Sequence, residues 1–253
     1  MTIPFSHALV TGGGSGVGKA VAEALAEAGV AVTVCGRRAE PLEALAAASR
    51  NIHAVAADIT DEAAVAALYE RAEALRGPFD IVVANAGIAS SALAHKTTLD
   101  DWKRTLDVNL TGSFLTVRPC LSGMTRRGAG RIVFIASVAG LKGYGYVAPY
   151  VASKHGVVGL MRALAVETAR TGVTVNAVCP SFVETDMLEE SVRRIVEKTG
   201  RSEEEARASL ATANPQGRFI QPAEVAAAVL YLCSEGAGSV TGQALSVSGG
   251  ETW

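Results

Sequence analysis

Short apolar runs alternate with longer amphipathic segments along the whole chain. The runs are continuous, and several are rich in β-branched residues, as in residues 30–34 and 173–178. This pattern is typical of strands that are buried on both faces of a sheet. We expect strands near the following residues: 8–10, 30–34, 53–56, 81–84, 132–135, 173–178 and 244–247.

Helix-length segments separate these strands. Strands joined in this way require right-handed crossovers, so the pattern predicts a doubly wound α/β fold with helices on both faces of a parallel sheet. No linker rich in proline or serine, no repeat and no low-complexity block interrupts the chain, and residues 1–253 are expected to form a single domain. The expected helices cover about 17–28, 41–48, 61–75, 100–127, 150–170 and 222–232.

The connection between residues 180 and 222 contains no strand-like run. Ordinary loops have about 4–6 residues, and residues 189–198 and 203–213 have an amphipathic pattern that favours two helices. These helices form either a surface pair or a lid over a ligand at the carboxyl ends of the strands, where open α/β sheets place their sites. We expect such a helical lid at about 186–221.

Composition limits the classes of function. Hydrophobic residues make up 49% of the 253 residues, which is enough for a sizeable core. With 23 basic and 25 acidic residues, the chain lacks the positive charge typical of proteins that bind nucleic acid or anionic membranes. No apolar run reaches the roughly 20 residues that span a bilayer, and the N-terminus has no signal-peptide pattern.

The four cysteines are far apart and form no Cys-x-x-Cys pair. This excludes a disulfide scaffold or a zinc ribbon and favours a reducing, cytoplasmic location. The four histidines have no spacing typical of metal ligands, so we expect no metal site.

A glycine cluster joins the first expected strand to the first expected helix. Gly12, Gly16 and Gly18 follow a Gly-x-x-x-Gly-x-Gly spacing. Glycines allow positive φ angles and close approach of a ligand, and the helix N-terminus attracts phosphate. Alone, the cluster could be a tight turn; between a strand and a helix, it predicts a Rossmann-type dinucleotide site.

The second expected strand is followed by Gly36, Arg37 and Arg38. Sites for NAD usually place an acidic residue here to bind the ribose 2′-hydroxyl. Two guanidinium groups suit a 2′-phosphate instead, because they form bidentate, charge-assisted hydrogen bonds. The sequence therefore predicts NADP(H) in preference to NAD(H), the alternative being that both arginines are solvated loop charges.

Three polar side chains are expected at the same edge of the sheet. Tyr150 and Lys154 are four residues apart at the start of a helix and so share one face. Ser137 follows the strand near 132–135 and lies at its carboxyl end, which is also the edge of the glycine cluster. We expect these three groups to form one site.

Taken together, these motifs resemble the short-chain dehydrogenase/reductase family along the whole chain. The resemblance implies a seven-stranded parallel sheet and a homotetramer. It depends on motifs that occur in the family's order and at similar spacing: the Thr11–Gly18 loop, Asp58, Asn85-Ala86-Gly87, Asn109, Ser137, Tyr150-x-x-x-Lys154 and the segment from Pro180 to Thr185.

The resemblance also implies catalytic roles. Tyr150 would be the acid/base that protonates the carbonyl oxygen during reduction, and Ser137 would hold the substrate oxygen. Lys154 would lower the pKa of Tyr150 from its ordinary value of about 10 and would hydrogen-bond the nicotinamide ribose. Asn109 would anchor a water molecule of a proton relay; the alternative is an asparagine that satisfies backbone groups inside a helix.

The implied cofactor contacts extend over nearly the first three quarters of the chain. Asp58 and Ile59 would contact the adenine, Asn85–Gly87 the adjacent ribose, and Val183 and Thr185 the nicotinamide carboxamide. The complete set is Gly12, Ser15, Gly16, Val17, Gly18, Arg37, Arg38, Asp58, Ile59, Asn85, Ala86, Gly87, Tyr150, Lys154, Val183 and Thr185. The aromatic residues that flank the catalytic segments are candidate substrate walls: Tyr144, Tyr146 and Phe182.

Two positions depart from the family pattern. Ser181 follows Pro180 where the family often has glycine, and Ser15 precedes Gly16 where some NADP enzymes have a basic residue. The second departure leaves the 2′-phosphate to Arg37 and Arg38. Basic residues in the lid would either contact a phosphopantetheine or CoA phosphate or form a solvated helix face: Arg193, Arg194 and Arg207.

The sequence therefore predicts an NADP(H)-dependent oxidoreductase that interconverts a ketone and a secondary alcohol. Resemblance to acyl-thioester and polyketide ketoreductases favours a 3-oxoacyl thioester or polyketide-type substrate. The alternative is a dehydrogenase of a sugar, cyclic or aryl secondary alcohol. A non-enzymatic NADP sensor is disfavoured because such proteins usually lose part of the catalytic set, and this chain keeps all four residues.

Overall fold

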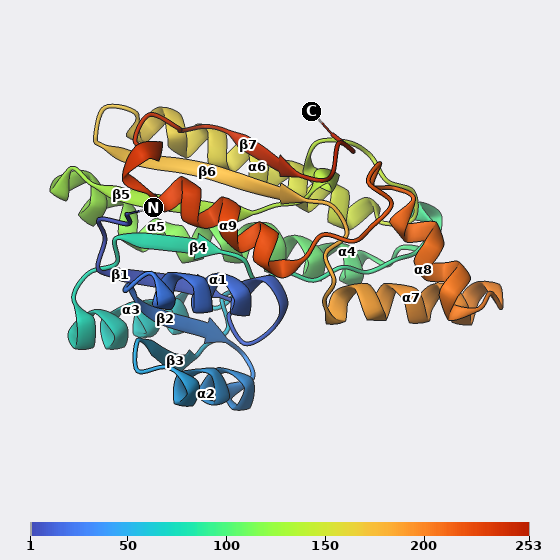
Figure 1. The fold of residues 1–253 in the computed structure, drawn as a ribbon, viewed down its shortest axis with the longest axis horizontal. Helices are drawn as coiled ribbons and strands as arrows, with labels where there is room; N and C mark the ends of the chain where they lie inside the picture. Colours follow the sequence, from blue (N-terminus) through green and yellow to red (C-terminus); the bar gives the residue numbers. More distant parts are fainter. Residues whose placement is uncertain (1, 253) are drawn as a thin grey trace.

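The computed structural model describes residues 2–252, which contain a parallel sheet of seven strands (Figure 1). All the expected strands are confirmed, and their ends lie within two residues of the predicted ones. The strands are β1 (His7–Thr11), β2 (Ala31–Gly36), β3 (Ile52–Ala56), β4 (Ile81–Ala84), β5 (Gly130–Ile135), β6 (Val173–Pro180) and β7 (Ala244–Val247).

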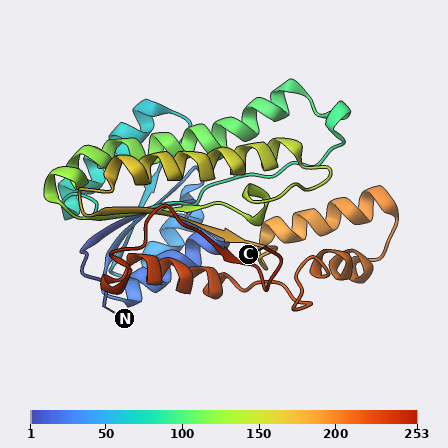
Figure 2. The same cartoon turned by 90° about the horizontal axis from the view of Figure 1, so that it is seen from above.

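Helices cover both faces of this sheet (Figure 2). One layer contains α3 (Glu62–Arg76), α5 (Gly112–Arg127) and α6 (Ala148–Thr168), and the opposite layer contains α1 (Gly16–Glu27), α2 (Ala39–Ala48) and α9 (Pro222–Cys233). The doubly wound Rossmann architecture is thus confirmed.

The strands are apolar over most of their length because the sheet is covered on both sides. In β1, Leu9 packs into the core beneath α5 and α6, whereas Ala8 and Val10 pack into the core beneath α1 and α9. All residues of β1, β5 and β6 are buried. Burial of each large aliphatic side chain contributes about 1.5–3 kcal/mol, which explains the continuous apolar runs.

The order of the strands determines where a ligand site can form. The order is β3-β2-β1-β4-β5-β6-β7, so the chain extends the sheet in one direction from β1 to β3 and in the other from β4 to β7. The loops that follow β1 and β4 therefore diverge to opposite faces and leave a crevice at the carboxyl ends of these strands.

The long helical region expected over about residues 100–127 is confirmed, but it is not a regular α-helix throughout. The segment consists of α4 (Leu99–Leu106), a π-helical turn (Asp107–Thr111) and α5. A π turn holds an extra residue and occurs frequently at functional sites. Hydrophobic periodicity cannot reveal it, because both flanking segments are ordinary helices.

The long connection contains the two expected helices, α7 (Asp186–Thr199) and α8 (Glu203–Ala211). They project beyond the carboxyl ends of the strands (Figures 1 and 2). A small separate apolar cluster holds them together through Leu188 and Val192 of α7 and Ala206 of α8. No helix within residues 2–252 is both long enough and apolar enough to cross a membrane.

Candidate active site

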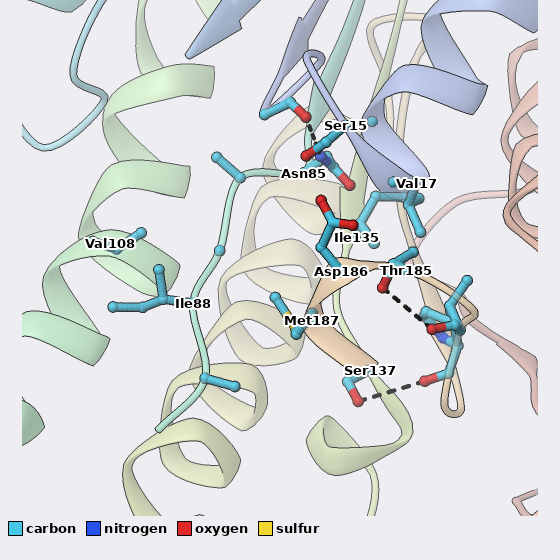
Figure 3. Close-up of a pocket in the computed structure, with 18 of the residues that line it drawn as sticks. Ser15, Val17, Asn85, Ile88, Val108, Ile135, Ser137, Thr185, Asp186 and Met187 are labelled. Carbon is cyan, nitrogen blue, oxygen red and sulfur yellow. Dashed lines mark hydrogen bonds between the residues drawn. The ribbon is translucent and has the colours of Figure 1, made fainter. Parts of the chain in front are cut away.

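A cavity of about 670 Å³ lies at the carboxyl ends of the strands. Figure 3 shows side chains from the loops that follow β1, β4 and β5 and from the N-cap of α7, including Ser15, Asn85, Ser137 and Thr185, arranged around it. Of the predicted site residues, all except Asn109 and Tyr146 line this one cavity. The lid also contributes to its wall through Asp186, Met187, Leu188 and Ser191.

The glycine loop forms one end of the cavity. Gly12 and Gly16 have φ angles of +66° and +51°, which side chains rarely tolerate. A Cβ on Gly18 would lie 2.3 Å from the carbonyl oxygen of Gly12, so only glycine allows the loop to close so tightly. Asn85 fixes the loop to β4, because its Nδ2 donates to the carbonyl oxygen of Thr11 at 2.8 Å.

The N-terminus of α1 points into this end of the cavity. Ser15 is the N-cap, but its side chain makes no capping hydrogen bond, and the first turn contains no acidic residue. The backbone N–H groups of the first turn thus keep their capacity to donate to an anion, and the helix dipole adds partial positive charge. This arrangement fits the pyrophosphate of a dinucleotide.

Two arginines line the cavity beyond the end of β2. Arg37 and Arg38 are exposed, and neither guanidinium forms a hydrogen bond or ion pair with another residue in the range 2–252. Nearby, the Asp58 carboxylate accepts from the backbone N–H and hydroxyl of Thr60 at 2.9 and 2.8 Å. These hydrogen bonds, with a smaller contribution from Arg37, lower the pKa of Asp58.

Helix α6 places Tyr150 and Lys154 on one face. The helix begins at Ala148, and Pro149 in its first turn suits that position because no intrahelical N–H is needed there. The Nζ atom of Lys154 lies 5.7 Å from the centre of the Tyr150 ring. It donates to the carbonyl oxygen of Ile135 at 2.8 Å, at the end of β5.

Burial changes the pKa values of both groups. Desolvation lowers the pKa of the Lys154 ammonium to about 8. Desolvation also raises the pKa of the Tyr150 phenol, and the adjacent Ser137 hydroxyl acts in the opposite direction. The phenol therefore keeps its proton near neutral pH unless positive charge is added beside it.

Ser137 is fixed at the end of β5. Its Oγ accepts the backbone N–H of Ala139 at 3.0 Å and lies 3.5 Å from the carbonyl oxygen of Pro180. The residue is 8% exposed and lines the cavity with Tyr150. The structure thus brings together the serine, tyrosine and lysine groups that the sequence places at one edge.

Asn109 occupies the π turn and is completely buried. Its Nδ2 donates to the carbonyl oxygen of Ile88 and to Oγ of Ser153, each at 2.9 Å, and its Oδ1 accepts the N–H of Ile88 at 2.8 Å. The side chain therefore joins the loop after β4 to α6. It does not line the cavity, and its role in a proton relay stays a prediction.

The three aromatic candidates have different positions. Tyr144 and Phe182 line the cavity, with ring centres 6.5 Å apart and planes at 86°. Tyr146 does not line it: its side chain is 64% exposed, and its backbone, at φ +68°, accepts the N–H of Ala92 at 2.8 Å. It contacts the neighbouring loop rather than the cavity.

Two of the three lid arginines considered as phosphate ligands form ion pairs with glutamates. Arg207 forms ion pairs with Glu189 at 2.5 Å and Glu184 at 3.1 Å, which join α8 to α7 and to the loop after β6. Arg194 pairs with Glu190 and donates to the carbonyl oxygen of Ala89 at 3.1 Å. These two arginines support the lid itself, whereas Arg193 is exposed.

Several residues of the cavity wall could not be predicted from the sequence. Ile88, Val108 and Met187 contribute apolar surface, and apolar residues beside a cavity have the same pattern as core residues. Ser181 also lines the wall; its departure from the usual glycine was the one available signal.

Known proteins resemble the chain over nearly its full length. A family model described as short chain dehydrogenase matches residues 6–195. An acetoacetyl-CoA reductase of Shinella zoogloeoides is 40% identical over 248 residues, which cover 96% of this chain and 97% of that protein. A cis-4-hydroxycyclohexanecarboxylate dehydrogenase of Sinomonas cyclohexanicum is 39% identical over 250 residues, 97% of this chain and 96% of that protein.

The fold comparison agrees. A crystal structure of a variant of actinorhodin polyketide ketoreductase with NADPH has a TM-score of 0.94 and 40% identity, and the match covers 99% of this chain and 98% of that one. The matched family model includes β1 through most of α7, and with them the cavity residues from Gly12 to Ser191. The chain therefore belongs to the short-chain dehydrogenase family, and it is an oxidoreductase that acts on CH–OH/C=O groups.

Proposed function

We propose that this protein is an NADP(H)-dependent ketoreductase that interconverts a ketone and a secondary alcohol, with Tyr150 as the acid/base. The observation that carries the proposal is that Ser137, Tyr150 and Lys154 line the same cavity as the glycine loop. A proton donor, a cation and a dinucleotide cradle thus meet at one place.

Three features support NADP(H) as the cofactor. The α1 N-terminus suits a pyrophosphate, the end of β2 has no acidic residue, and Arg37 and Arg38 provide two guanidinium groups for a 2′-phosphate. The related ketoreductase structure contains NADPH. When bound, the nicotinamide would supply hydride for reduction or accept it in oxidation.

Side chains of the protein bind the substrate oxygen and deliver the proton to it. In reduction, the Ser137 hydroxyl holds the substrate oxygen, and the Tyr150 phenol donates its proton to that oxygen as negative charge develops there. Work near pH 7 requires a Tyr150 pKa up to about three units below 10, or about 4 kcal/mol of preference for the phenolate. The Lys154 ammonium, 5.7 Å from the ring centre, supplies part of this stabilisation.

The favoured substrates are 3-oxoacyl thioesters or polyketide-type ketones. The names of two relatives support this class, since one reduces acetoacetyl-CoA and the other a polyketide. The alternative, a cyclic secondary alcohol, is supported by the relative that oxidises cis-4-hydroxycyclohexanecarboxylate. Comparison of kcat/KM for acetoacetyl-CoA and 4-oxocyclohexanecarboxylate separates the two classes.

The protein is also proposed to be cytoplasmic and homotetrameric. The four cysteines are free and buried, as suits a reducing compartment. Large apolar side chains on α4 and α5, Leu99, Trp102 and Phe114, are exposed and can be covered by another subunit.

The decisive experiment compares wild type with Tyr150→Phe. Loss of the proton donor should lower kcat about 10²–10⁴-fold, with a Kd for NADPH within about twofold of wild type because the ring volume is kept. Tyr231→Phe, at an exposed position on α9, is the control. Equal activity of Tyr150→Phe and wild type would refute the role of Tyr150. A wild type that binds NADPH but reduces no ketone would favour a nucleotide sensor.

A further inference from the structure

A buried carboxylate lies behind the part of the cavity that Tyr144, Ser181 and Phe182 line, which we call the substrate end. Glu251 follows β7, and its side chain is only 2% exposed. A buried ionised carboxylate requires partners that offset its desolvation. Within residues 2–252, every partner of this carboxylate comes from a segment that borders the candidate active site.

Two separate segments donate to Glu251. Oε1 accepts from the Tyr144 hydroxyl and lies 2.9 Å from Nζ of Lys142, both in the loop before α6. Oε2 accepts from the Ser181 hydroxyl in the loop after β6. The Nζ atom of Lys142 also lies 5.0 Å from the centre of the Tyr144 ring.

A glycine pair brings Glu251 to this position. Gly249 and Gly250 have φ angles of +62° and +96°, so the chain turns sharply after β7. A Cβ on Gly249 would lie 1.9 Å from Oδ1 of Asn214, a buried residue. The turn is therefore packed closely against the end of the lid connection, and the direction of Glu251 is fixed.

We propose that Glu251 is a positioning residue that sets the shape of the substrate end by holding Tyr144 and Ser181. The inference rests on the proposed ketoreductase function and extends it to substrate recognition. Because the Tyr144 hydroxyl donates to Glu251, its proton is not available to a substrate. Tyr144 instead presents its ring, with Phe182 at its edge, as an aromatic wall beside Ser137 and Tyr150.

The same contact explains the serine at position 181. A glycine there could not donate to Glu251, whereas Ser181 ties the loop after β6 to the segment after β7. This serine and Glu251 thus act as a pair, and a glycine at position 181 removes one of the two links between Glu251 and the cavity wall.

Substitution of Glu251 should change substrate binding more than turnover. In Glu251→Ala, we expect the KM for acetoacetyl-CoA to rise about tenfold, the effect of losing one hydrogen bond to a charged group. The kcat and the Kd for NADPH should stay within about threefold of wild type, since the residues that hold the cofactor are untouched. Glu251→Gln keeps the volume and an acceptor for Tyr144, so it should restore most of the affinity.

A double-mutant cycle tests whether Glu251 acts through Tyr144. The KM of the Glu251→Ala/Tyr144→Phe double variant should be close to that of Glu251→Ala alone, because contacting residues are non-additive. Glu204→Ala is the matched control, since Glu204 is an exposed glutamate on α8. Additive effects in the cycle would refute action through Tyr144.

Amide hydrogen exchange provides a measurement that does not require activity. In Glu251→Ala, residues 141–147 should exchange about tenfold faster than in Glu204→Ala, because Tyr144 and Lys142 lose their anchor. Unchanged exchange together with an unchanged KM would overturn the proposal. If wild type reduces no ketone, the proposed function fails, whereas the exchange result still decides whether Glu251 anchors this loop.

Discussion

Arg37 and Arg38 place two positive charges at the edge of the cavity next to Asp58. Because neither pairs with another residue in 2–252, both can bind an anion. We predict that Arg37→Ala/Arg38→Ala raises the KM for NADPH about 10–100-fold, the range for loss of charge-assisted hydrogen bonds. The KM for NADH should change less than threefold.

Initial-rate kinetics with both nucleotides check this prediction. Arg50→Ala, at another exposed arginine, is the control. A wild-type enzyme with a higher kcat/KM for NADH than for NADPH would contradict the preference for NADP(H), and equal losses with both nucleotides would contradict the 2′-phosphate contact.

The burial of Lys154 makes the free energy of unfolding depend on pH. Its pKa falls from 10.5 to about 8 on burial, so between these pH values the unfolded chain holds more protons than the folded one. Stability therefore rises with pH across this window. We predict that Lys154→Met, which removes the buried charge, raises the free energy of unfolding by about 2–3 kcal/mol more at pH 7 than at pH 10.

Urea unfolding without nucleotide at the two pH values measures this difference. Effects of the substitution that do not depend on the protonation of Lys154 are equal in both measurements, so they cancel. Lys19→Met, with a half-exposed side chain, shows what removal of a surface ammonium does over the same range. The same stability change from Lys154→Met at both pH values would show that burial does not lower the pKa of Lys154.

At the level of single residues, the sequence predicts groups whose chemistry belongs to a motif. Gly18, Ser137 and Tyr150 line the cavity as expected. It could not predict the position of Tyr146, because the direction of a side chain in a loop depends on the local φ angle, here +68°.

Among the elements, the π turn between α4 and α5 joins the loop after β4 to α6 through the side chain of Asn109. Asn109 satisfies both backbone groups of Ile88 and bonds Ser153. We predict that Asn109→Ala lowers the free energy of unfolding by about 2–4 kcal/mol, because it leaves buried backbone groups without partners. Asn51→Ala, which loses one partly buried hydrogen bond to Ala26, should cost about 1 kcal/mol.

Urea unfolding of the two variants provides the comparison. If Asn109→Ala is no more destabilising than Asn51→Ala, the turn does not depend on this side chain. The sequence indicated an asparagine inside a helix but not the π turn, because the turn arises from contacts with Ile88 and Ser153, which are distant along the chain.

The lid also combines features that the sequence could predict with features that it could not. An amphipathic pattern predicted both helices, since it depends on local spacing. The pattern could not show which residues meet the cavity or that Arg207 joins Glu184 to Glu189. Ion pairs between elements depend on how the helices pack, and that packing is fixed by the apolar cluster around Leu188 and Val192.

On the scale of the whole molecule, the alternation of strands and helices was sufficient to predict the layers. A parallel sheet buried on both faces requires both the apolar runs and the crossovers. The contact of Glu251 with Tyr144 was not predictable, because no local pattern links residues separated by 107 positions.

The proposed homotetramer is testable at this scale. Sedimentation equilibrium should give a mass of about 104 kDa, four times the chain mass of 26.0 kDa. Trp102→Glu, at an exposed apolar position on α4, should shift the mass to smaller species, because a buried charge destabilises an interface. Wild type that sediments at 26 kDa would contradict assembly.

The turn at Gly249 and Gly250 also has a consequence for biosynthesis. Glu251 is translated 107 residues after Tyr144, or roughly 5–20 s later at ordinary rates of synthesis. Loops close in well under a millisecond, so the segment around Tyr144 samples many arrangements before its anchor exists. A ribosome that stalls short of residue 251 thus leaves a chain with every proposed nucleotide-binding residue but without the side chain that anchors Tyr144.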